Sequence, residues 1–210
     1  EGRIFRMENA LKLDTVVLAE NGDSETVVKM CRNLSRIMRY ITNTAETTVT
    51  LREELDYVQK YLYCMKVRYQ SSLNYSIDVD ESLLDQPVPK LIIQPIVENA
   101  IRYGSNCAPP WNISITSVVT EGSWQIEVTD SGPGFTEEAK ERITANIMKA
   151  IQNPGLPELK INGLGTVNVY LRWKIFCKGD IIFRYGNNAD GHGVVSIGRY
   201  FQNKEDTETV

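Results

Sequence analysis

Apolar residues recur at helical spacing in the first third of the chain, at alternating steps of four and three. The first stripe lies within residues 27–41 and the second within residues 51–65. The second helix also has a start signal, because Thr50 followed by Glu53 matches a capping box. An earlier, less regular helix is expected over about residues 4–19. The stripes consist of Val27, Cys31, Leu34, Met38 and Ile41, and of Leu51, Leu55, Val58, Leu62 and Met65.

The pattern changes to that of strands from residue 73, where apolar and polar residues alternate up to Val79. Two further alternating segments are joined by a short polar turn and predict a hairpin. Three helices are expected between the strands, and the stretch over residues 153–162, rich in Asn, Pro and Gly, is expected to be mobile. The expected hairpin covers 112–119 and 124–130, the last strands cover 180–185 and 194–200, and the helices cover 90–103, a segment from Thr136, and 164–177.

Helices come first and strands interleaved with helices follow, which predicts an α+β fold: a two-layer α/β sandwich with an N-terminal helical segment. The expected division is a helical segment over 1–70, a second domain over 71–201 and a flexible tail over 202–210. The apolar stripes leave two alternatives open. The helices either pack within one chain or form the seam of a dimer.

Composition sets limits on the class of partner. The 210 residues are 42% hydrophobic and 24% charged, which allows a sizeable core. With 23 Lys and Arg against 27 Asp and Glu, the net charge of -4 gives no general attraction to nucleic acid or anionic lipid. No nucleic-acid partner is expected. No apolar run approaches the roughly 18 residues that span a bilayer, and a chain that begins at Glu1 is expected to be a piece of a longer protein.

The first cluster of candidate functional residues lies within an apolar helix. Glu98 and Asn99 are embedded there, where an amide or carboxylate without a partner is unfavourable. Mg²⁺ prefers one or two protein oxygens together with waters and phosphates, which makes Asn99 a candidate ligand. Arg102 follows one turn after Glu98, on the same helix face, where its fork of donors can meet a phosphate.

Two further clusters contain paired glycines. Asp130 ends a strand ahead of Gly132 and Gly134, and a carboxylate fixed there can accept a hydrogen bond from an exocyclic amine such as that of adenine. Gly163 and Gly165 open a helix, whose N-terminal amides attract phosphate. Each cluster alone has an ordinary explanation as a tight turn, a helix cap or a buried side chain bonded to backbone. All three in this order favour a nucleotide site.

With these motifs the chain resembles the LytS-type sensor histidine kinases, whose ATP-binding domain has the Bergerat (GHKL) fold shared by gyrase, Hsp90 and MutL. The resemblance runs from about residue 9 to 199. It implies a Bergerat-type sandwich preceded by a helical dimerisation segment. Its motifs are Leu34-Ser35, Arg39-Tyr40, Thr50-Leu51-x-x-Glu54-Leu55, Val88-Pro89-x-Leu91-Ile92-x-Gln94-Pro95-x-Val97-Glu98-Asn99-Ala100-Ile101, and both glycine boxes, the second extended to Arg172.

The resemblance implies ATP and Mg²⁺ as cofactors and assigns roles by position. Asn99 would be the Mg²⁺ ligand and Glu98 its polar neighbour and a weak base. Arg102 would contact a phosphate, with Tyr103 near the base or sugar. The other implied roles are recognition of the adenine amine by Asp130, a pocket floor at Gly132 and Gly134, closure on the phosphates by Gly163, Leu164, Gly165 and Thr166, and an ATP lid over about 136–162.

The resemblance also implies a function and its partners. The family transfers the γ-phosphoryl group of ATP to a histidine, for relay to the receiver domain of a response regulator. It implies a homodimer formed through the N-terminal helices. It further implies that this chain is a cytoplasmic part of a bacterial inner-membrane protein whose membrane segments lie upstream.

The chain departs from the family at the phosphoacceptor. Counting back from Asn9 places Phe5 where the histidine belongs, and a phenyl ring has no lone pair to attack phosphorus. The single histidine, His192, is interpreted as a surface residue at a turn. An alternative function is therefore a degenerate kinase that acts as an ATP-binding regulatory or interaction module. A third, an ATPase or clamp of the wider superfamily, is disfavoured by Pro95, which occupies the position of the water-activating carboxylate.

Overall fold

The computed structural model describes residues 23–152 and 165–201. Several expectations lie outside these residues. They are the helix over 4–19, the register at Phe5, the two residues Gly163 and Leu164, the stretch over 153–162, and the tail from residue 202.

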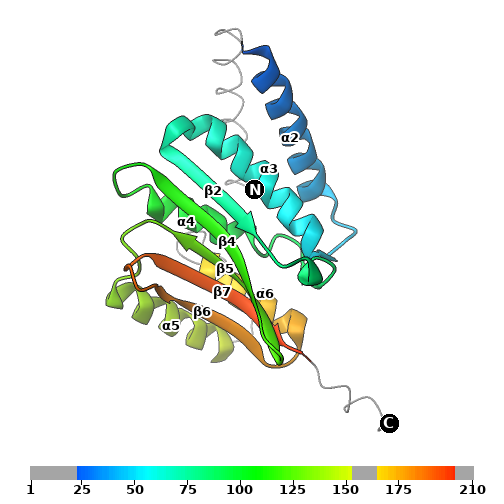
Figure 1. Ribbon diagram of the computed structural model, residues 1–210. Coiled ribbons are helices and arrows are strands. Elements are labelled where there is room, and N and C mark those ends of the chain that lie inside the picture. The colour runs from blue at the N-terminus through cyan, green and yellow to red at the C-terminus, as the bar shows by residue number, and fades with distance from the viewer. Residues whose placement is uncertain (1–22, 153–164, 202–210) are drawn as a thin grey trace.

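A five-stranded mixed sheet forms one layer of the fold (Figure 1). Its first two strands are parallel and all other neighbours are antiparallel. The predicted hairpin is confirmed as the second and third strands in the order. That order is β2 (Leu73–Asp78), β4 (Trp111–Val119), β5 (Ser123–Asp130), β7 (Gly193–Tyr200) and β6 (Ile181–Asn187).

Helices form the second layer on one face of this sheet. Along β5 the side chains of Trp124, Ile126 and Val128 are buried, and the polar residues between them are half-exposed. Figure 1 shows the helices on the far side of the sheet, and the two-layer α+β sandwich is confirmed. The helices are α4 (Gln94–Gly104), α5 (Glu137–Gln152) and α6 (Gly165–Cys177), and short 3₁₀ helices cover Gln70–Ser72 and Glu81–Leu83.

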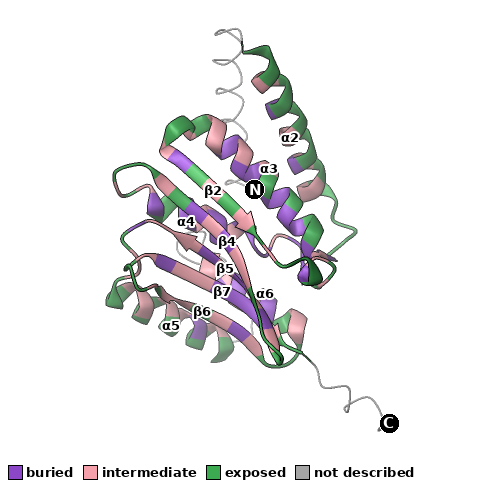
Figure 2. Cartoon of the chain, in the orientation of Figure 1, coloured by how far each residue is buried: buried purple, intermediate pink, exposed green. Residues whose placement is uncertain are grey.

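Within residues 23–70 the helical segment contains α2 (Ser24–Thr42) and α3 (Leu51–Tyr69), joined through β1 (Thr48–Thr50), which pairs with β3 (Pro87–Pro89). The capping box is confirmed, because the Thr50 hydroxyl accepts from the Glu53 amide at 3.2 Å and the Glu53 carboxylate accepts from the Thr50 amide at 2.8 Å. Helix α3 has nine buried residues, visible as purple bands in Figure 2, and it packs beside β2.

Helix α2 packs less deeply than α3. Its buried residues are Met30 and Ile37, whereas Cys31 of the predicted stripe is exposed. The face that packs within the chain is therefore rotated from the predicted stripe, and a dimer seam stays a prediction. Within the described ranges, no helix is both long and apolar enough to span a bilayer.

Helix α4 begins at Gln94 instead of at residue 90. Leu91 has a φ of 58°, in the left-handed region that interrupts a right-handed helix. Pro95 lies in the first turn of the helix, where a backbone N–H is not needed. The apolar run from residue 90 is therefore a turn followed by a helix, and this turn precedes the residues of the first polar cluster.

Candidate functional site

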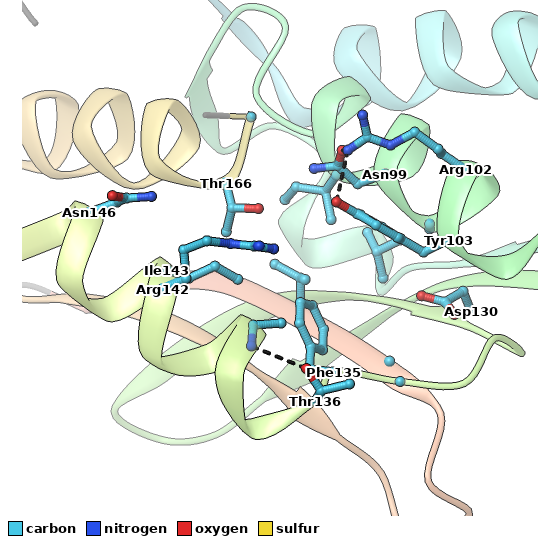
Figure 3. A pocket seen from close by; sticks show the side chains of 18 residues that line it. Asn99, Arg102, Tyr103, Asp130, Phe135, Thr136, Arg142, Ile143, Asn146 and Thr166 are labelled. Carbon is cyan, nitrogen blue, oxygen red and sulfur yellow. Dashed lines mark hydrogen bonds between the residues drawn. The ribbon is translucent and has the colours of Figure 1, made fainter. Parts of the chain in front are cut away.

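A cavity of about 220 Å³ lies between α4, the end of β5, and helices α5 and α6 (Figure 3). Buried apolar side chains line part of it, and polar side chains reach it from α4, β5, α5 and α6. It is lined by Ile96, Asn99, Ala100, Arg102, Tyr103, Val128, Asp130, Gly134, Phe135, Thr136, Ala139, Arg142, Ile143, Asn146, Gly165, Thr166, Gly193 and Val195.

Helix α4 brings Asn99, Arg102 and Tyr103 to the cavity, because residues three and four apart share one helix face. Arg102 Nη2 donates to Asn99 Oδ1 at 2.9 Å and to the Tyr103 hydroxyl at 3.0 Å. The Arg102 guanidinium also lies 4.7 Å from the centre of the Tyr103 ring. These three side chains form a connected group, with Tyr103 44% exposed.

Glu98 is not among the residues that line the cavity. Its Oε1 accepts a 2.8 Å hydrogen bond from Gln94 Nε2. Its position near α3 is also evident from Tyr61, whose pKa is raised by burial and then by the charge of Glu98. The structure therefore separates Glu98 from Asn99, although the two are neighbours in sequence.

Asp130 ends β5, and its carboxylate is confined between two glycines. Its Oδ1 accepts from the Gly132 amide at 2.8 Å. A Cβ added at Gly193 would lie 2.7 Å from Oδ2, which is closer than a side chain can approach. Burial raises the pKa of Asp130, and the Gly132 amide and the charge of His192 oppose this shift.

His192 is not the surface residue expected from its place in a glycine turn. It is half-buried, and its Nδ1 lies 2.9 Å from the carbonyl oxygen of Gly132. Pairing of β5 with β7 places Thr129 opposite Val194, which brings His192 and Gly193 to Asp130. The sequence could not show this, since the two strands are some sixty residues apart.

Gly134 and Phe135 fix the start of the segment that leads to α5. Gly134 has a φ of 73°, and a Cβ there would lie 2.3 Å from the carbonyl oxygen of Gly191. The Phe135 amide donates to Asn187 Oδ1 at 2.7 Å, and Asn187 Nδ2 donates to the Phe135 carbonyl at 3.1 Å. Gly134 lines the cavity, and Gly132 donates to Asp130, whose carboxylate also lines it.

Helices α5 and α6 form the opposite wall. Arg142, Ile143 and Asn146 of α5 face Thr166 at the start of α6 (Figure 3). A Cβ added at Gly165 would lie 3.1 Å from Asn99 Nδ2, so the N-terminus of α6 packs directly against Asn99. The residues of α5 were missed because its sequence predicts a polar helix without indicating which face meets the cavity. The described part of the chain has no group of three or more acidic, His or Cys residues suited to a metal.

Two family models match the chain. Residues 84–197 match histidine kinase-, DNA gyrase B-, and HSP90-like ATPases. The chain belongs to this ATPase family. Residues 8–73 match the histidine kinase family. The helical segment therefore precedes the ATPase domain, which is the order found in the core of a sensor histidine kinase.

Curated relatives are sensor histidine kinases. The chain is 30% identical over 158 residues to an uncharacterized sensor-like histidine kinase of Staphylococcus epidermidis, covering 74% of this chain and 30% of the relative. It is 31% identical over 119 residues to sensor histidine kinase YesM of Bacillus subtilis, with coverages of 56% and 21%. For sensor protein LytS of Oceanobacillus iheyensis the identity is 30% over 152 residues, with coverages of 71% and 25%. The chain thus spans less than a third of each relative, and the resemblance to LytS-type kinases is confirmed.

Solved histidine kinase structures are also similar. The nucleotide-free catalytic domain of histidine kinase ThkA has a TM-score of 0.49 and 23% identity, covering 72% of this chain and 94% of that one. ThkA in complex with response regulator protein TrrA has a TM-score of 0.47 and 19% identity, covering 83% of this chain and 49% of that one.

Proposed function

We propose that the cavity binds ATP with Mg²⁺ and that the chain is a kinase core that transfers the γ-phosphoryl group to a histidine. The observation that carries the proposal is the convergence of Asn99, Arg102 and Asp130 on one cavity that the N-terminus of α6 also borders. This cavity lies in a chain of the ATPase family.

Asp130 is the group that recognises adenine. Its Oδ1 is held by the Gly132 amide, which leaves Oδ2 to accept from the exocyclic amine of the base. The apolar side chains of Ile96, Ala100 and Val128 line the same cavity and suit the flat faces of a purine. Burial of Asp130 strengthens its preference for a base with an amine over a base without one, because a buried carboxylate that lacks a donor is unfavourable.

The phosphates extend toward α4 and α6. Arg102 and Arg142 offer guanidinium groups from opposite walls, and the amides at the start of α6 attract anions. Phosphoryl transfer needs mainly positioning and neutralisation of charge, which these groups supply. Gly163 and Leu164 are proposed to complete this end of the site.

Asn99 fits a single-oxygen ligand of Mg²⁺. Its Oδ1 lies at the cavity, where it already accepts from the cationic Arg102. Mg²⁺ is usually held by one or two protein oxygens, with phosphates and waters as the other ligands. When bound, the ion would neutralise phosphate charge. Glu98 is bonded to Gln94 and is proposed to hold the helix in place instead of moving a proton.

The histidine that receives the phosphoryl group is proposed to be supplied in trans, since the register counted back from Asn9 places Phe5 at its position. The receiver domain of a response regulator would then take the group. Dimerisation through the helical segment and attachment to an inner membrane by upstream segments belong to the same proposal. The same residue also favours the second candidate, a degenerate kinase that binds ATP for regulation.

An Asp130→Asn variant tests the nucleotide site. Because it keeps an oxygen for the Gly132 amide but presents an NH₂ group to the adenine amine, we expect the Kd for ATP with Mg²⁺ to rise by about 10- to 100-fold. Isothermal titration calorimetry measures this. Asp85→Asn is the control, since that side chain is 84% exposed and lies outside the cavity. An unaltered affinity in Asp130→Asn contradicts the adenine assignment.

Labelled ATP separates the two candidate functions. Acid-labile label on the chain itself would contradict the loss of the phosphoacceptor. Label transferred only to an added histidine-bearing partner supports phosphorylation in trans. Nucleotide binding without any transfer supports the regulatory module.

A further inference from the structure

Glu54 of α3 is a fully buried carboxylate that lies outside the cavity. Its Oε2 accepts from the Tyr40 hydroxyl at 2.6 Å and from the Leu91 amide at 2.8 Å. Its Oε1 accepts from the Ile93 amide at 2.9 Å. All three partners are donors, which favours the ionised carboxylate and opposes the rise in the pKa of Glu54 that burial causes.

Arg172 of α6 binds the same turn from the other side. Its Nη1 donates to the Leu91 carbonyl at 2.9 Å, and its Nη2 donates to the Lys90 carbonyl. Lys90 itself is buried, donates to the Asn43 carbonyl at 2.5 Å and lies 4.6 Å from the centre of the Tyr40 ring. We call Tyr40, Glu54 and Arg172 around residues 90–93 the clamp. It joins α2, α3 and α6 to the turn before α4.

The turn is held in an unfavourable conformation. A leucine at a φ of 58° lies in the left-handed region, where its Cβ crowds the following carbonyl oxygen. Leu91 keeps it while its N–H is bound by Glu54 and its C=O by Arg172. Strained backbone of this kind persists where surrounding groups determine it, so the clamp sets the direction in which the chain enters α4.

Both helices that the clamp fixes border the cavity. Helix α4 begins at Gln94, directly after the turn, and carries Asn99, Arg102 and Tyr103. Helix α6 carries Arg172 and begins at Gly165, against Asn99. The clamp therefore connects α4 and α6 at the end of the cavity where the phosphates are proposed to bind.

We infer that Glu54 is a positioning residue for the nucleotide site, acting with Arg172 through the turn at residues 90–93. The inference rests on the proposed function, because it assumes that the cavity binds ATP. It makes ATP affinity depend on the contact between the helical segment and the ATPase domain. Since coupling between two sites is reciprocal, bound ATP also strengthens the clamp.

The test is ATP affinity in a Glu54→Gln variant, which keeps the side-chain size and removes the charge. An NH₂ group then faces one of the three donors, and the turn is released. We expect the Kd for ATP with Mg²⁺ to rise between about 5-fold and about 100-fold at a temperature where circular dichroism shows the variant folded. Arg172→Gln acts on the same turn, so the double variant should lose less than the product of the single losses.

Two stacked tyrosines supply a matched control. The rings of Tyr40 and Tyr57 lie 4.5 Å apart at 22°. Tyr40→Phe removes a hydroxyl that binds Glu54, whereas Tyr57→Phe removes a buried hydroxyl that has no hydrogen-bond partner among the described residues. We expect Tyr40→Phe to raise the Kd by about 5-fold and Tyr57→Phe to leave it unchanged.

The outcomes separate the inference from the proposed function. If the unmodified chain binds no ATP, the proposed function fails and the inference with it. If the chain binds ATP and Glu54→Gln loses stability but keeps the same Kd, the clamp only stabilises the fold. The inference is then overturned while the proposed function stands. Equal changes in the two phenylalanine variants would overturn it as well.

Discussion

The two walls of the cavity are built differently. Helix α4 has six buried residues among eleven, and the Asp130 carboxylate at the end of β5 is enclosed by Gly132 and Gly193. Helix α5 on the other wall has one buried residue, Ile147, among sixteen, and its Arg142 is exposed. The fold therefore fixes the wall that carries Asp130 and is proposed to recognise the base. Few contacts set the α5 wall, whose Arg142 is proposed to meet the phosphates together with Arg102 of α4. Base recognition and phosphate contact should respond separately to substitution.

The largest effect is expected at Gly193. In Gly193→Ala the new Cβ would lie 2.7 Å from Asp130 Oδ2, and the carboxylate must move away from the base. The affinities for ATP and for adenosine should both fall by about 10- to 100-fold, measured by calorimetry. Gly122→Ala is the control, because no atom lies within 4 Å of a Cβ there. Unchanged adenosine binding in Gly193→Ala would show that this wall is not the base site.

A smaller and more selective effect is expected on the opposite wall. Arg142→Gln removes a partly solvated cation, so ATP affinity should fall by about 5-fold while adenosine affinity stays constant. Lys149→Gln removes an exposed cation from the same helix outside the cavity and should change neither. If Arg142→Gln lowers adenosine affinity as much as ATP affinity, Arg142 contacts the base. The assignment of base recognition and phosphate contact to different residues is then wrong.

At neutral pH the smallest effect is expected from the protonation of Asp130, and it grows as the pH falls. Burial raises the pKa of this carboxyl, with Gly132 and His192 opposing the shift. Adenosine binding should therefore weaken as the pH falls through the raised pKa, by up to about tenfold per pH unit below it. Because the folded chain then binds this proton more tightly than the unfolded chain, protonation of Asp130 stabilises the fold as the pH falls.

Measuring adenosine affinity against pH checks this prediction without titrating phosphates. Asp130→Asn should give a flat profile over the same range. A wild-type profile as flat as that of the variant would contradict a role for the ionised carboxylate. The direction of the stability change separates lost binding from acid unfolding.

The sequence was most informative where a site residue lies within a local motif. Asn99 and Arg102 lie on one helix face, and Asp130 lies at a strand end followed by glycines, so spacing alone places them. Gly193 could not be found in this way, because it reaches Asp130 only through the pairing of β5 with β7. The cavity-facing side of α5, with Arg142, depends on how that helix packs beside α6.

The start of α4 also depends on contacts that are distant in sequence and that local spacing cannot show. Apolar residues continue from Leu91 into the helix, so periodicity extends it back to residue 90. The actual start is set by Glu54, which binds the amides of Leu91 and Ile93 from almost forty residues away. Glu54 and Arg172 are visible in the sequence as motif residues, but only the structure shows that they meet at one turn.

Asn187 has a consequence for how the cavity can open. Its side-chain amide accepts from the N–H of Phe135 and donates to the C=O of Phe135, as a neighbouring strand would, at the edge strand β6. An outward swing of α5 would therefore pivot after Phe135, at Thr136, whose hydroxyl caps the helix by accepting from the Ala139 amide. It would also break the 2.7 Å hydrogen bond between the Thr144 and Tyr185 hydroxyls. The backbone of Phe135 would stay bound to Asn187 while α5 moved, so the Phe135 ring would remain in the lining of the cavity.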